Sequence, residues 1–113
     1  MSVNKVILLG NVGRDPSIRY VQERQIAEVA LATNERARTL ASGVQVPERT
    51  EWHRLVMWDG NAELAEKYVR KGTRLYIEGS LRTRVWEDRS TIKHSVTEIY
   101  VDKMEILSRP SEK

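Results

Sequence analysis

Tryptophan and arginine alternate in two stretches of this 113-residue chain. Residues 50–60, TEWHRLVMWDG, hold Trp52, Arg54 and Trp58, and residues 81–86 read LRTRVW. Aromatic rings are surfaces on which unpaired bases stack at about 1–3 kcal/mol per base. Guanidinium groups neutralise phosphates, which makes such binding depend on salt. These residue types at this spacing therefore point to binding of a single-stranded polyanion.

Alternate residues of a strand share a face, so each stretch divides into two rows. The first rows are expected to be Trp52, Arg54, Val56 and Trp58 in one stretch and Arg82, Arg84 and Trp86 in the other. The opposite rows are Glu51, His53, Leu55 and Met57, and Leu81, Thr83 and Val85. Arginine is rarely buried unpaired, which favours exposed tryptophan–arginine rows. The alternative is that Trp52 and Trp58 are buried in an oligomer interface or under a loop.

Positive charge is concentrated in one segment. The chain has a formal net charge of +3, whereas residues 70–93 hold seven basic side chains against three acidic ones, a net charge of +4. A basic stripe suits a polyanion. The alternative is a solvated charged face, because charge alone does not specify a ligand.

Apolar residues recur mostly with the period of a strand. Five strands are predicted, over residues 6–9, 26–34, 50–58, 73–86 with a bend at Gly79, and 94–107. Residues 15–25 are interpreted as a turn or hairpin opened by Asp15 and Pro16. Residues 36–49 are interpreted as a polar loop.

Residues 61–71 follow a helical period instead. Leu64, Ala65, Tyr68 and Val69 fall on one predicted face. Asn61 is expected as N-cap and Gly72 as the C′ residue, with Glu63–Lys67 and Glu66–Arg70 as i,i+4 pairs. Three strands, a helix and two strands is the order of the OB-fold, a five-stranded Greek-key barrel that binds oligonucleotides or oligosaccharides. The sequence thus predicts an all-β fold with one short helix.

The length of the chain indicates one domain. Residues 1–107 are predicted to form it, and residues 108–113 to be a short disordered tail. No apolar run approaches the roughly 20 residues of a membrane span, and no signal peptide is recognisable. The chain has no cysteine, which excludes disulfides and thiolate metal sites and is typical of a cytoplasmic protein.

No pattern indicates an enzyme. The GxxG at residues 10–13 follows a strand and is interpreted as a turn or bulge rather than a phosphate-binding loop. His53 and His94 have no carboxylate cluster at ligand spacing, so no metal and no other cofactor is expected. Nucleophile-elbow, Walker and zinc-protease motifs are absent from the sequence.

Two other kinds of binding protein share parts of this pattern. An oligosaccharide- or protein-binding OB module also uses aromatic rings, but sugar binding does not need Arg54, Arg82 and Arg84 beside the tryptophans. A structural partner in a primosome or recombination complex would show weak DNA affinity and a tight heteromeric interface.

Four segments closely resemble the bacterial single-stranded-DNA-binding protein family. They are VNKVILLGNVGRDP at 3–16, TEWHRLVMW at 50–58, YVRKGTRLYIEGSLRTRVW at 68–86 and VTEIYVDKMEIL at 96–107. The resemblance covers residues 3–107 in order and is most specific from Lys71 to Trp86. It implies an OB-fold homotetramer, a dimer of dimers, that binds and protects single-stranded DNA regardless of sequence. The implied setting is replication, recombination and repair in the cytoplasm, in association with the nucleoid.

The resemblance also implies roles for individual residues. The family's base-stacking aromatics correspond to Trp52, Trp58 and Trp86, and Trp58 stands where many members have Phe. Basic positions along the DNA path correspond to Arg54, Lys71, Arg82 and Arg84, with Arg38, Arg14, Arg19 and Lys5 as further candidates. Subunit contacts are implied for His53, Asn4, Val6, Leu8 and Tyr76, and the first strand resembles an edge that pairs with another subunit.

The sequence departs from the family pattern in two places. Ala37 stands where many members have Trp, and Arg36 and Arg38 are expected to compensate in part by stacking. The usual family protein continues into a Gly/Pro/Gln-rich linker and an acidic tip that recruits replication and repair proteins. This sequence ends at Lys113 without them, so the expectation is a short or trimmed chain that lacks tail-mediated recruitment.

Overall fold

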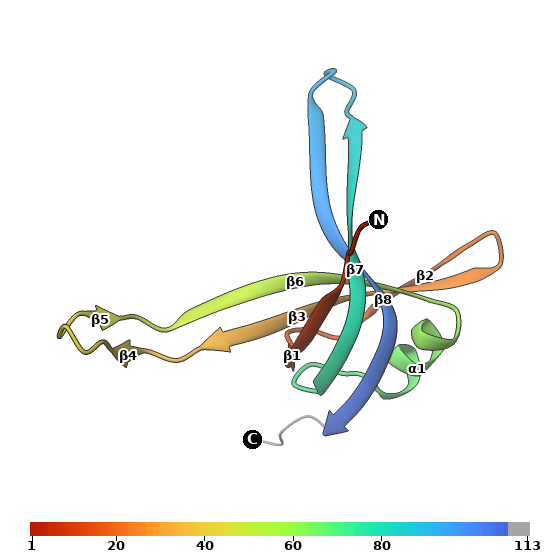
Figure 1. Ribbon diagram of the computed structural model, residues 1–113. Coiled ribbons are helices and arrows are strands. Elements are labelled where there is room, and N and C mark those ends of the chain that lie inside the picture. The colour runs from red at the N-terminus through yellow and green to blue at the C-terminus, as the bar shows by residue number, and fades with distance from the viewer. Residues whose placement is uncertain (109–113) are drawn as a thin grey trace.

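The computed structural model describes residues 1–108 of the chain (Figure 1). The elements in chain order are β1 (Val6–Val12), β2 (Ser17–Val21), β3 (Arg24–Glu35), β4 (Arg38–Thr39), β5 (Gln45–Val46), β6 (Arg49–Trp58), α1 (Gly60–Tyr68), β7 (Arg74–Glu87) and β8 (Lys93–Ser108). β8 includes Ser108, the first residue of the predicted tail, and residues 109–113 of that tail lie outside the described residues.

Five strands close into a ring. β1 pairs with β7, β7 with β8, β8 with β6, β6 with β3, and β3 with β1 again. The β6–β8 pair is parallel and the other four pairs are antiparallel. The predicted mostly-β barrel of five strands with one helix is therefore confirmed.

The inward-facing side chains of the ring form the core. From β3 and β6 these are Ala27, Val29, Leu31, Leu55 and Met57, all buried. Leu75 and Ile77 of β7 and Ile99 and Val101 of β8 complete the core. The predicted alternation of β3 and β6 is confirmed, and the alternate residues that remain are held on the outside of the barrel.

Residues 15–25, predicted as a turn or hairpin, form a hairpin, and the predicted polar loop at residues 36–49 contains a short strand ladder. β2 forms a hairpin with β3 through Gln22 and Glu23, whose φ angles are 49° and 68°. This left-handed pair matches the twist of a two-residue hairpin turn. The predicted polar loop 36–49 carries the two-residue strands β4 and β5, which prolong the β3–β6 ribbon away from the barrel (Figure 1).

β7 and β8 continue past the barrel as a two-stranded arm, defined here as residues 81–98 (Figure 1). The pairing register shifts between Glu78 and Gly79, at the base of the arm. A Cβ at Gly79 would lie 2.2 Å from the carbonyl oxygen of Tyr100, so a larger residue would push β8 away. This irregularity agrees with the bend predicted at Gly79.

The helix differs from its prediction at both ends. α1 begins at Gly60 after Asp59 and ends at Tyr68, so the predicted caps Asn61 and Gly72 are wrong. The Asp59 side chain binds Arg24 rather than the first helical turn, and Asp59 has a φ of 54°. Local sequence favoured Asn61, but the Arg24–Asp59 contact joins residues that are far apart in the chain.

The buried face of α1 is also narrower than predicted. Ala62, Ala65 and Val69 are buried, whereas Leu64 and Tyr68 are exposed. The predicted Glu63–Lys67 ion pair is present at 3.1 Å. The predicted partner of Arg70 is wrong in detail, because its guanidinium donates to the backbone carbonyl of Glu66 and not to the carboxylate.

Candidate nucleic-acid interface

A continuous outer face crosses β3, β6, β8 and β7. On β6, Trp52 lies opposite Ala32, and Val56 lies between Glu28 of β3 and Tyr100 of β8. Along β7 and β8, the facing pairs on the same side are Ser80–Tyr100, Arg82–Glu98, Arg84–Val96 and Trp86–His94. The pairing thus places the two predicted tryptophan–arginine rows on one side of the sheet. We call the outer side of β3 and β6, with Trp52, Arg54 and Trp58, the wall.

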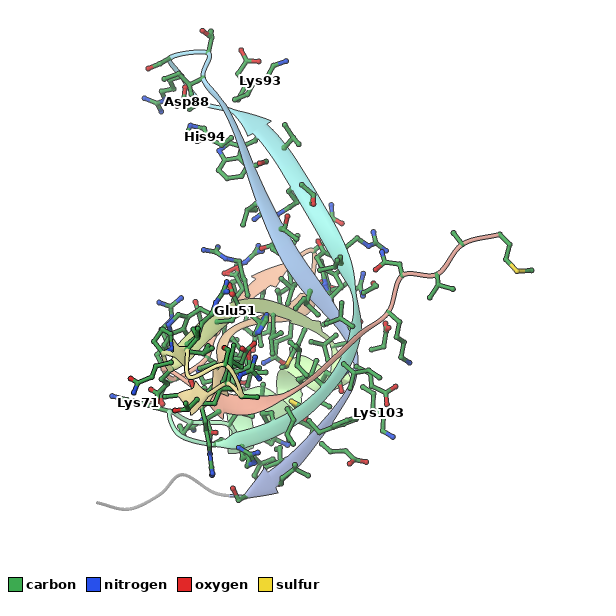
Figure 2. The ribbon with its side chains drawn as sticks, turned by 60° about the vertical axis from the view of Figure 1, so that its left-hand side comes forward. Glu51, Lys71, Asp88, Lys93, His94 and Lys103 are labelled. Carbon is green, nitrogen blue, oxygen red and sulfur yellow. The ribbon has the colours of Figure 1, made fainter. Side chains whose placement is uncertain are left out.

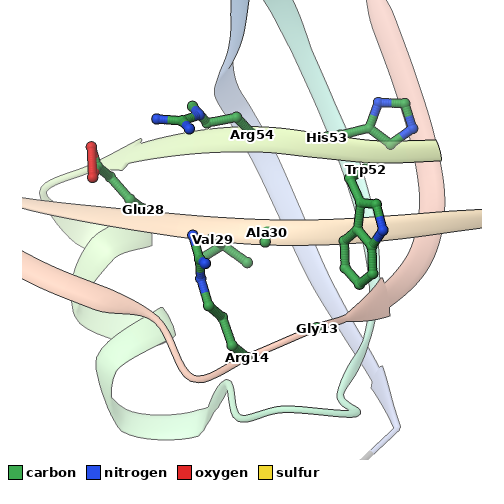
Figure 3. A pocket seen from close by; sticks show the side chains of 8 residues that line it. All are labelled: Gly13, Arg14, Glu28, Val29, Ala30, Trp52, His53 and Arg54. Atoms are coloured by element: carbon green, nitrogen blue, oxygen red, sulfur yellow. The ribbon is translucent and has the colours of Figure 1, made fainter.

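Trp52 is the most open of the three tryptophans, with 59% of the residue exposed. Its ring approaches the loop after β1, where a Cβ on Gly13 would lie 2.3 Å from the ring atom Cζ3. A groove of about 390 Å³ lies beside the ring (Figure 3). Its lining consists of Gly13, Arg14, Glu28, Val29, Ala30, Trp52, His53 and Arg54. A flat ring entering this groove would meet an indole with two guanidinium groups at the margin.

Trp58 is half-buried at the other end of β6. The guanidinium of Arg24 lies 4.6 Å from the centre of its ring, in cation–π contact. Asp59 holds that guanidinium at 2.7 Å, and this contact keeps the pKa of the Asp59 carboxyl below its ordinary value. Tyr100 lies 6.5 Å from Trp58, at a tilt of 46°. Trp58 is thus a partly covered ring within a cluster of aromatic and basic groups.

Tyr100 continues this cluster towards the arm. The Arg82 guanidinium lies 5.0 Å from the centre of the Tyr100 ring. Neither Arg82 nor Arg54 forms an ion pair within residues 1–108. Both positive charges are therefore available to a ligand on this face.

Trp86 lies on the arm, with 45% of the residue exposed. Its ring stacks on His94 at 5.3 Å and 23°, and His94 contacts the carboxylate of Asp88 at 2.7 Å (Figure 2). Asp88 also accepts hydrogen bonds from the backbone of Ser90 and Ile92. The contact with His94, followed by these backbone donors, lowers the pKa of Asp88. Contacts within the arm itself thus set the position of Trp86.

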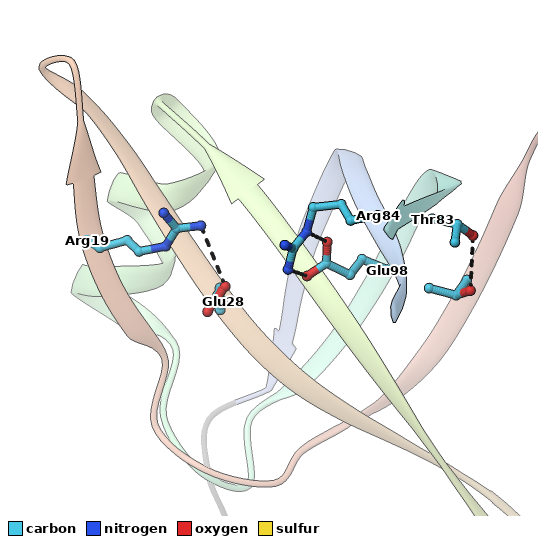
Figure 4. A network of polar contacts seen from close by, with 6 residues as sticks. Arg19, Glu28, Thr83, Arg84 and Glu98 are labelled. Atoms are coloured by element: carbon cyan, nitrogen blue, oxygen red, sulfur yellow. Dashed lines mark hydrogen bonds and ion pairs between the residues drawn. The ribbon is translucent and has the colours of Figure 1, made fainter. Parts of the chain in front are cut away.

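Arg84 and Glu98 form a bidentate pair, with nitrogen–oxygen distances of 2.8 and 3.2 Å (Figure 4). The Glu98 residue is only 2% exposed although it belongs to the outer face. The hydrogen bonds that Arg84 donates to Glu98 raise the pKa of Arg84 above its ordinary value, and the charge of Glu28 contributes in the same direction. Arg84 also lies 5.6 Å from the Trp86 ring.

The other basic candidates are spread more widely. Arg19 lies on β2, 3.7 Å from Glu28, and so reaches the margin of the wall (Figure 4). The backbone N–H of Lys71 donates to the Asp15 carboxylate at 2.8 Å, which places Lys71 beside the loop that carries Arg14. Arg38 lies on β4, at the far end of the β3–β6 ribbon.

Lys5 is separated from the tryptophans. It pairs with Glu78 at 2.9 Å on the outer side of β1 and β7. Tyr76 donates its hydroxyl to the same carboxylate. These contacts lower the pKa of Glu78, with Tyr76 as the larger cause and Lys5 as the smaller.

Of the residues predicted for subunit contacts, some pack against the core and others lie at the surface of the barrel. Val6 and Leu8 pack against the core, whereas Ile7 and Leu9 between and after them are exposed. The Asn4 side chain exchanges two hydrogen bonds with the backbone of Leu81, extending the β1–β7 ladder by a step.

His53 and Tyr76 are both partly buried. The His53 ring contacts the Thr33 hydroxyl at 2.9 Å at the margin of the groove. Tyr76 faces outward beside Leu9 in the β1–β7 pairing. On the side of β1 away from β7, only Asn11 and Val12 pair with β3, and Gly10 lies against the backbone of Ala32. Residues 6–9 have no ladder partner on that side among the described residues.

Sequence reasoning missed four residues of this face. Tyr100, Arg24, Glu98 and His94 contact the predicted tryptophans and arginines directly. Alternation along β8 would have placed Tyr100 and Glu98 in one row. However, the sequence near Tyr100 does not indicate the parallel β6–β8 pairing that brings Tyr100 to Val56. That pairing also explains why Val56, predicted in the exposed row, is only 3% exposed.

Two absences hold for the described part of the chain. No helix within residues 1–108 is long and apolar enough to cross a bilayer. In the same residues no three side chains of His, Cys, Asp or Glu form a group able to hold a metal ion.

A closed five-stranded barrel with an aromatic and basic outer face defines a protein of the OB-fold class. The model of the Single-strand binding protein family matches residues 3–107. The chain belongs to this family, whose members are DNA-binding proteins and not enzymes. The predicted family and the absence of an enzymatic activity are thus confirmed.

Two known proteins show how close the similarity is. The chain is 53% identical over 109 residues to a single-stranded DNA-binding protein of Bacteroides thetaiotaomicron, covering 96% of this chain and 68% of the relative. Its fold matches that of a Plasmodium falciparum SSB in complex with ssDNA, with a TM-score of 0.83 and 35% sequence identity. The structural match covers 96% of this chain and 97% of the other.

Proposed function

We propose that this protein binds and protects single-stranded DNA without regard to sequence during replication, recombination and repair. Bases stack on Trp52, Trp58 and Trp86, and phosphates are neutralised by Arg54 and Arg82. The observation that carries the proposal is the single outer face on which three tryptophans and these arginines lie together. Its place is the cytoplasm, in association with the nucleoid.

The geometry supports single strands over duplex. The indoles of Trp52 and Trp86 are open enough to accept a base, and a base in a duplex is already stacked and out of reach. The described residues of the face offer rings and charges rather than a set of donors and acceptors aimed at base edges. Every base has a flat face, so stacking of this kind tolerates any sequence.

The path of the strand follows the positions of the rings. Arg14 and Lys71 lie at the Trp52 end of the wall, and Arg19 lies at its margin. From there the strand would cross Tyr100 and Arg82 and reach Trp86 on the arm. Arg38 would contact a strand only if it continued along the β3–β6 ribbon. Lys5, which is paired with Glu78 on the outer side of β1 and β7, is not assigned to this path.

The protein is proposed to work as a homotetramer, a dimer of dimers. Residues 6–9 of β1 present an edge without a ladder partner among the described residues, and a second β1 would pair with it. Exposed Ile7 and Leu9, together with Tyr76, form an apolar outer surface next to that edge. In this proposal, replication and repair proteins act on the same single-stranded DNA. No surface of this chain is assigned to direct contact with them.

Binding is tested by fluorescence anisotropy with labelled oligo(dT) and a duplex of equal length, at low and moderate salt. The proposal predicts tight binding of the single strand, much weaker binding of the duplex, and a clear loss of affinity with salt. Equal affinity for both DNAs would contradict the stacking mechanism. Failure to bind oligo(dT) at low salt would contradict the proposed function itself.

The assembly is tested by light scattering at dilute concentration. His53→Glu introduces a negative charge next to the groove and is expected to lower the measured mass. His53→Gln keeps a hydrogen-bonding partner for Thr33 and serves as the control. A tetramer that His53→Glu leaves intact would remove His53 from the proposed interface.

A further inference from the structure

The Arg84–Glu98 pair lies in the middle of the proposed DNA path. Its two side chains differ greatly in solvent exposure. The Arg84 side chain is 51% exposed, whereas the Glu98 side chain is 2% exposed. Both carboxylate oxygens of Glu98 accept hydrogen bonds from the one guanidinium. A buried carboxylate without a partner is strongly unfavourable, so the two hydrogen bonds from Arg84 stabilise Glu98 in its buried position.

A phosphate and Glu98 would compete for the same cation. A phosphate that withdrew Arg84 would leave Glu98 buried without its partner, which is strongly unfavourable. A phosphate that shared Arg84 would approach a pair with no net charge, which attracts it only weakly. In both cases Arg84 neutralises little phosphate charge. It therefore displaces few of the salt cations bound to the strand and contributes little to the salt dependence of binding.

Arg54 and Arg82 differ from Arg84 in this respect. Neither has a carboxylate partner within residues 1–108. Like Arg84, each alternates along its strand with inward-facing residues and lies on the same outer face. Arg82 lies over the Tyr100 ring, and an aromatic ring does not neutralise its charge.

We infer that Glu98 is an affinity-setting residue of the DNA face, because it holds the charge of Arg84 within the protein and leaves phosphate neutralisation to Arg54 and Arg82. Arg84 then acts as a positioning residue, with its guanidinium 5.6 Å from the Trp86 ring. The inference rests on the proposed binding of single-stranded DNA. It separates three arginines that the sequence pattern treats as equivalent.

The readout is the slope of the logarithm of the binding constant for oligo(dT) against the logarithm of salt concentration. For single strands each neutralised phosphate contributes about 0.7 to the steepness of this slope. Glu98→Gln removes the charge that masks Arg84, so the slope is expected to become steeper by about 0.7 for each Arg84 on the strand. Arg82→Met is expected to make it shallower by about the same amount.

The double variant Arg84→Met/Glu98→Gln removes both partners and leaves no buried charge behind. The inference predicts the wild-type slope for this variant, whatever its affinity, since Arg84 also supports Trp86. If Glu98→Gln alone does not fold, this variant decides the question. A double-variant slope shallower by about 0.7 would show that Arg84 contacts phosphate and would overturn the inference.

Glu63→Gln is the matched control, because it removes one negative charge from α1 and leaves the DNA face intact. It is expected to keep the wild-type slope. An equal steepening by Glu63→Gln and Glu98→Gln would mean that net charge alone matters, which overturns the role of Glu98. The wild-type titration separates the two proposals: without salt-dependent binding of oligo(dT) the proposed function fails, and with it only the variant slopes judge the inference.

Discussion

The wall and the arm carry the same pattern of tryptophan and arginine on different supports. Beneath the wall, Leu55 and Met57 are completely buried, so alternate residues of β6 reach the core. In the arm, Leu81 and Val85 occupy the corresponding inward row and are exposed. The rings of the wall are therefore fixed by the barrel, whereas Trp86 depends on His94, Arg84 and the turn at Asp88.

This contrast shows that one sequence pattern can specify the chemistry of a face without specifying its rigidity. Burial of the opposite row makes the wall part of the cooperative fold. The arm has hydrogen bonds and ion pairs but no core, and local opening is favoured in segments with few buried contacts. The proposed binding surface thus consists of the wall, which the barrel core fixes, and the arm, which only its own hydrogen bonds and ion pairs hold in place.

The largest difference is expected in stability. Leu55→Ala should lower the free energy of unfolding by about 2–5 kcal/mol, because it leaves a cavity under the wall. Val85→Ala should change it by no more than about 0.5 kcal/mol, because Val85 is 68% exposed. Urea denaturation followed by circular dichroism measures both. Comparable losses in the two variants would contradict the contrast between wall and arm.

Loss of a tryptophan from the wall and loss of one from the arm are expected to weaken DNA binding by similar amounts. Trp52→Ala and Trp86→Ala should each weaken oligo(dT) binding by on the order of 1–3 kcal/mol, through the loss of a stacked base. Anisotropy titrations measure this, and Tyr68→Ala on α1 is the control because Tyr68 is exposed but lies off the face. A folded tryptophan variant that binds like wild type would identify that residue as packing.

The contact between Gly13 and Trp52 provides a test confined to the wall. A Cβ at Gly13 would overlap the ring, so Gly13→Ala should displace Trp52 and weaken binding by about 1 kcal/mol. Gly60→Ala is the control, because a Cβ at Gly60 meets no atom within 4 Å. In the double variant with Trp52→Ala the loss should not increase further. Additive losses would show that Gly13 acts through another contact.

The smallest effect is expected at the turn of the arm, in acid. The pKa of Asp88 is lowered in the folded protein, so its contribution is present above its ordinary value of 3.8 and is lost as the pH falls below that value. The NMR amide signals of Ser90 and Ile92 should therefore shift at low pH, and Asp88→Asn should abolish this titration. Concurrent shifts throughout the wall would indicate global unfolding rather than a local change.

Local periodicity was sufficient to predict much of the fold. Alternation identified the inward rows of β3 and β6 because each strand has one buried face, and Gly79 marked the base of the arm. The N-cap was mispredicted because the Arg24–Asp59 contact comes from a distant strand. Val56 and Tyr100 could not be assigned for the same reason, since the parallel β6–β8 pairing joins residues 44 positions apart.

For the site, sequence identified the residue types but not their partners. Spacing placed Trp52 and Trp58 in one row and Trp86 in a row of another strand, and the strand pairing puts the two rows on one side of the sheet. Their neighbours Arg24, His94 and Glu98 were missed because side-chain pairing depends on register between strands. That pairing separates Arg84 from Arg54 and Arg82, which periodicity alone cannot do.

The most direct test of the central claim uses variants that each retain one tryptophan and replace the other two with phenylalanine. Their intrinsic fluorescence is followed during titration with oligo(dT) and with duplex of equal length. If wall and arm form one stacking surface, the single strand should strongly quench both Trp52 and Trp86, and the duplex should have little effect. Quenching of Trp52 without quenching of Trp86, in folded protein, would show that the arm is not part of the surface.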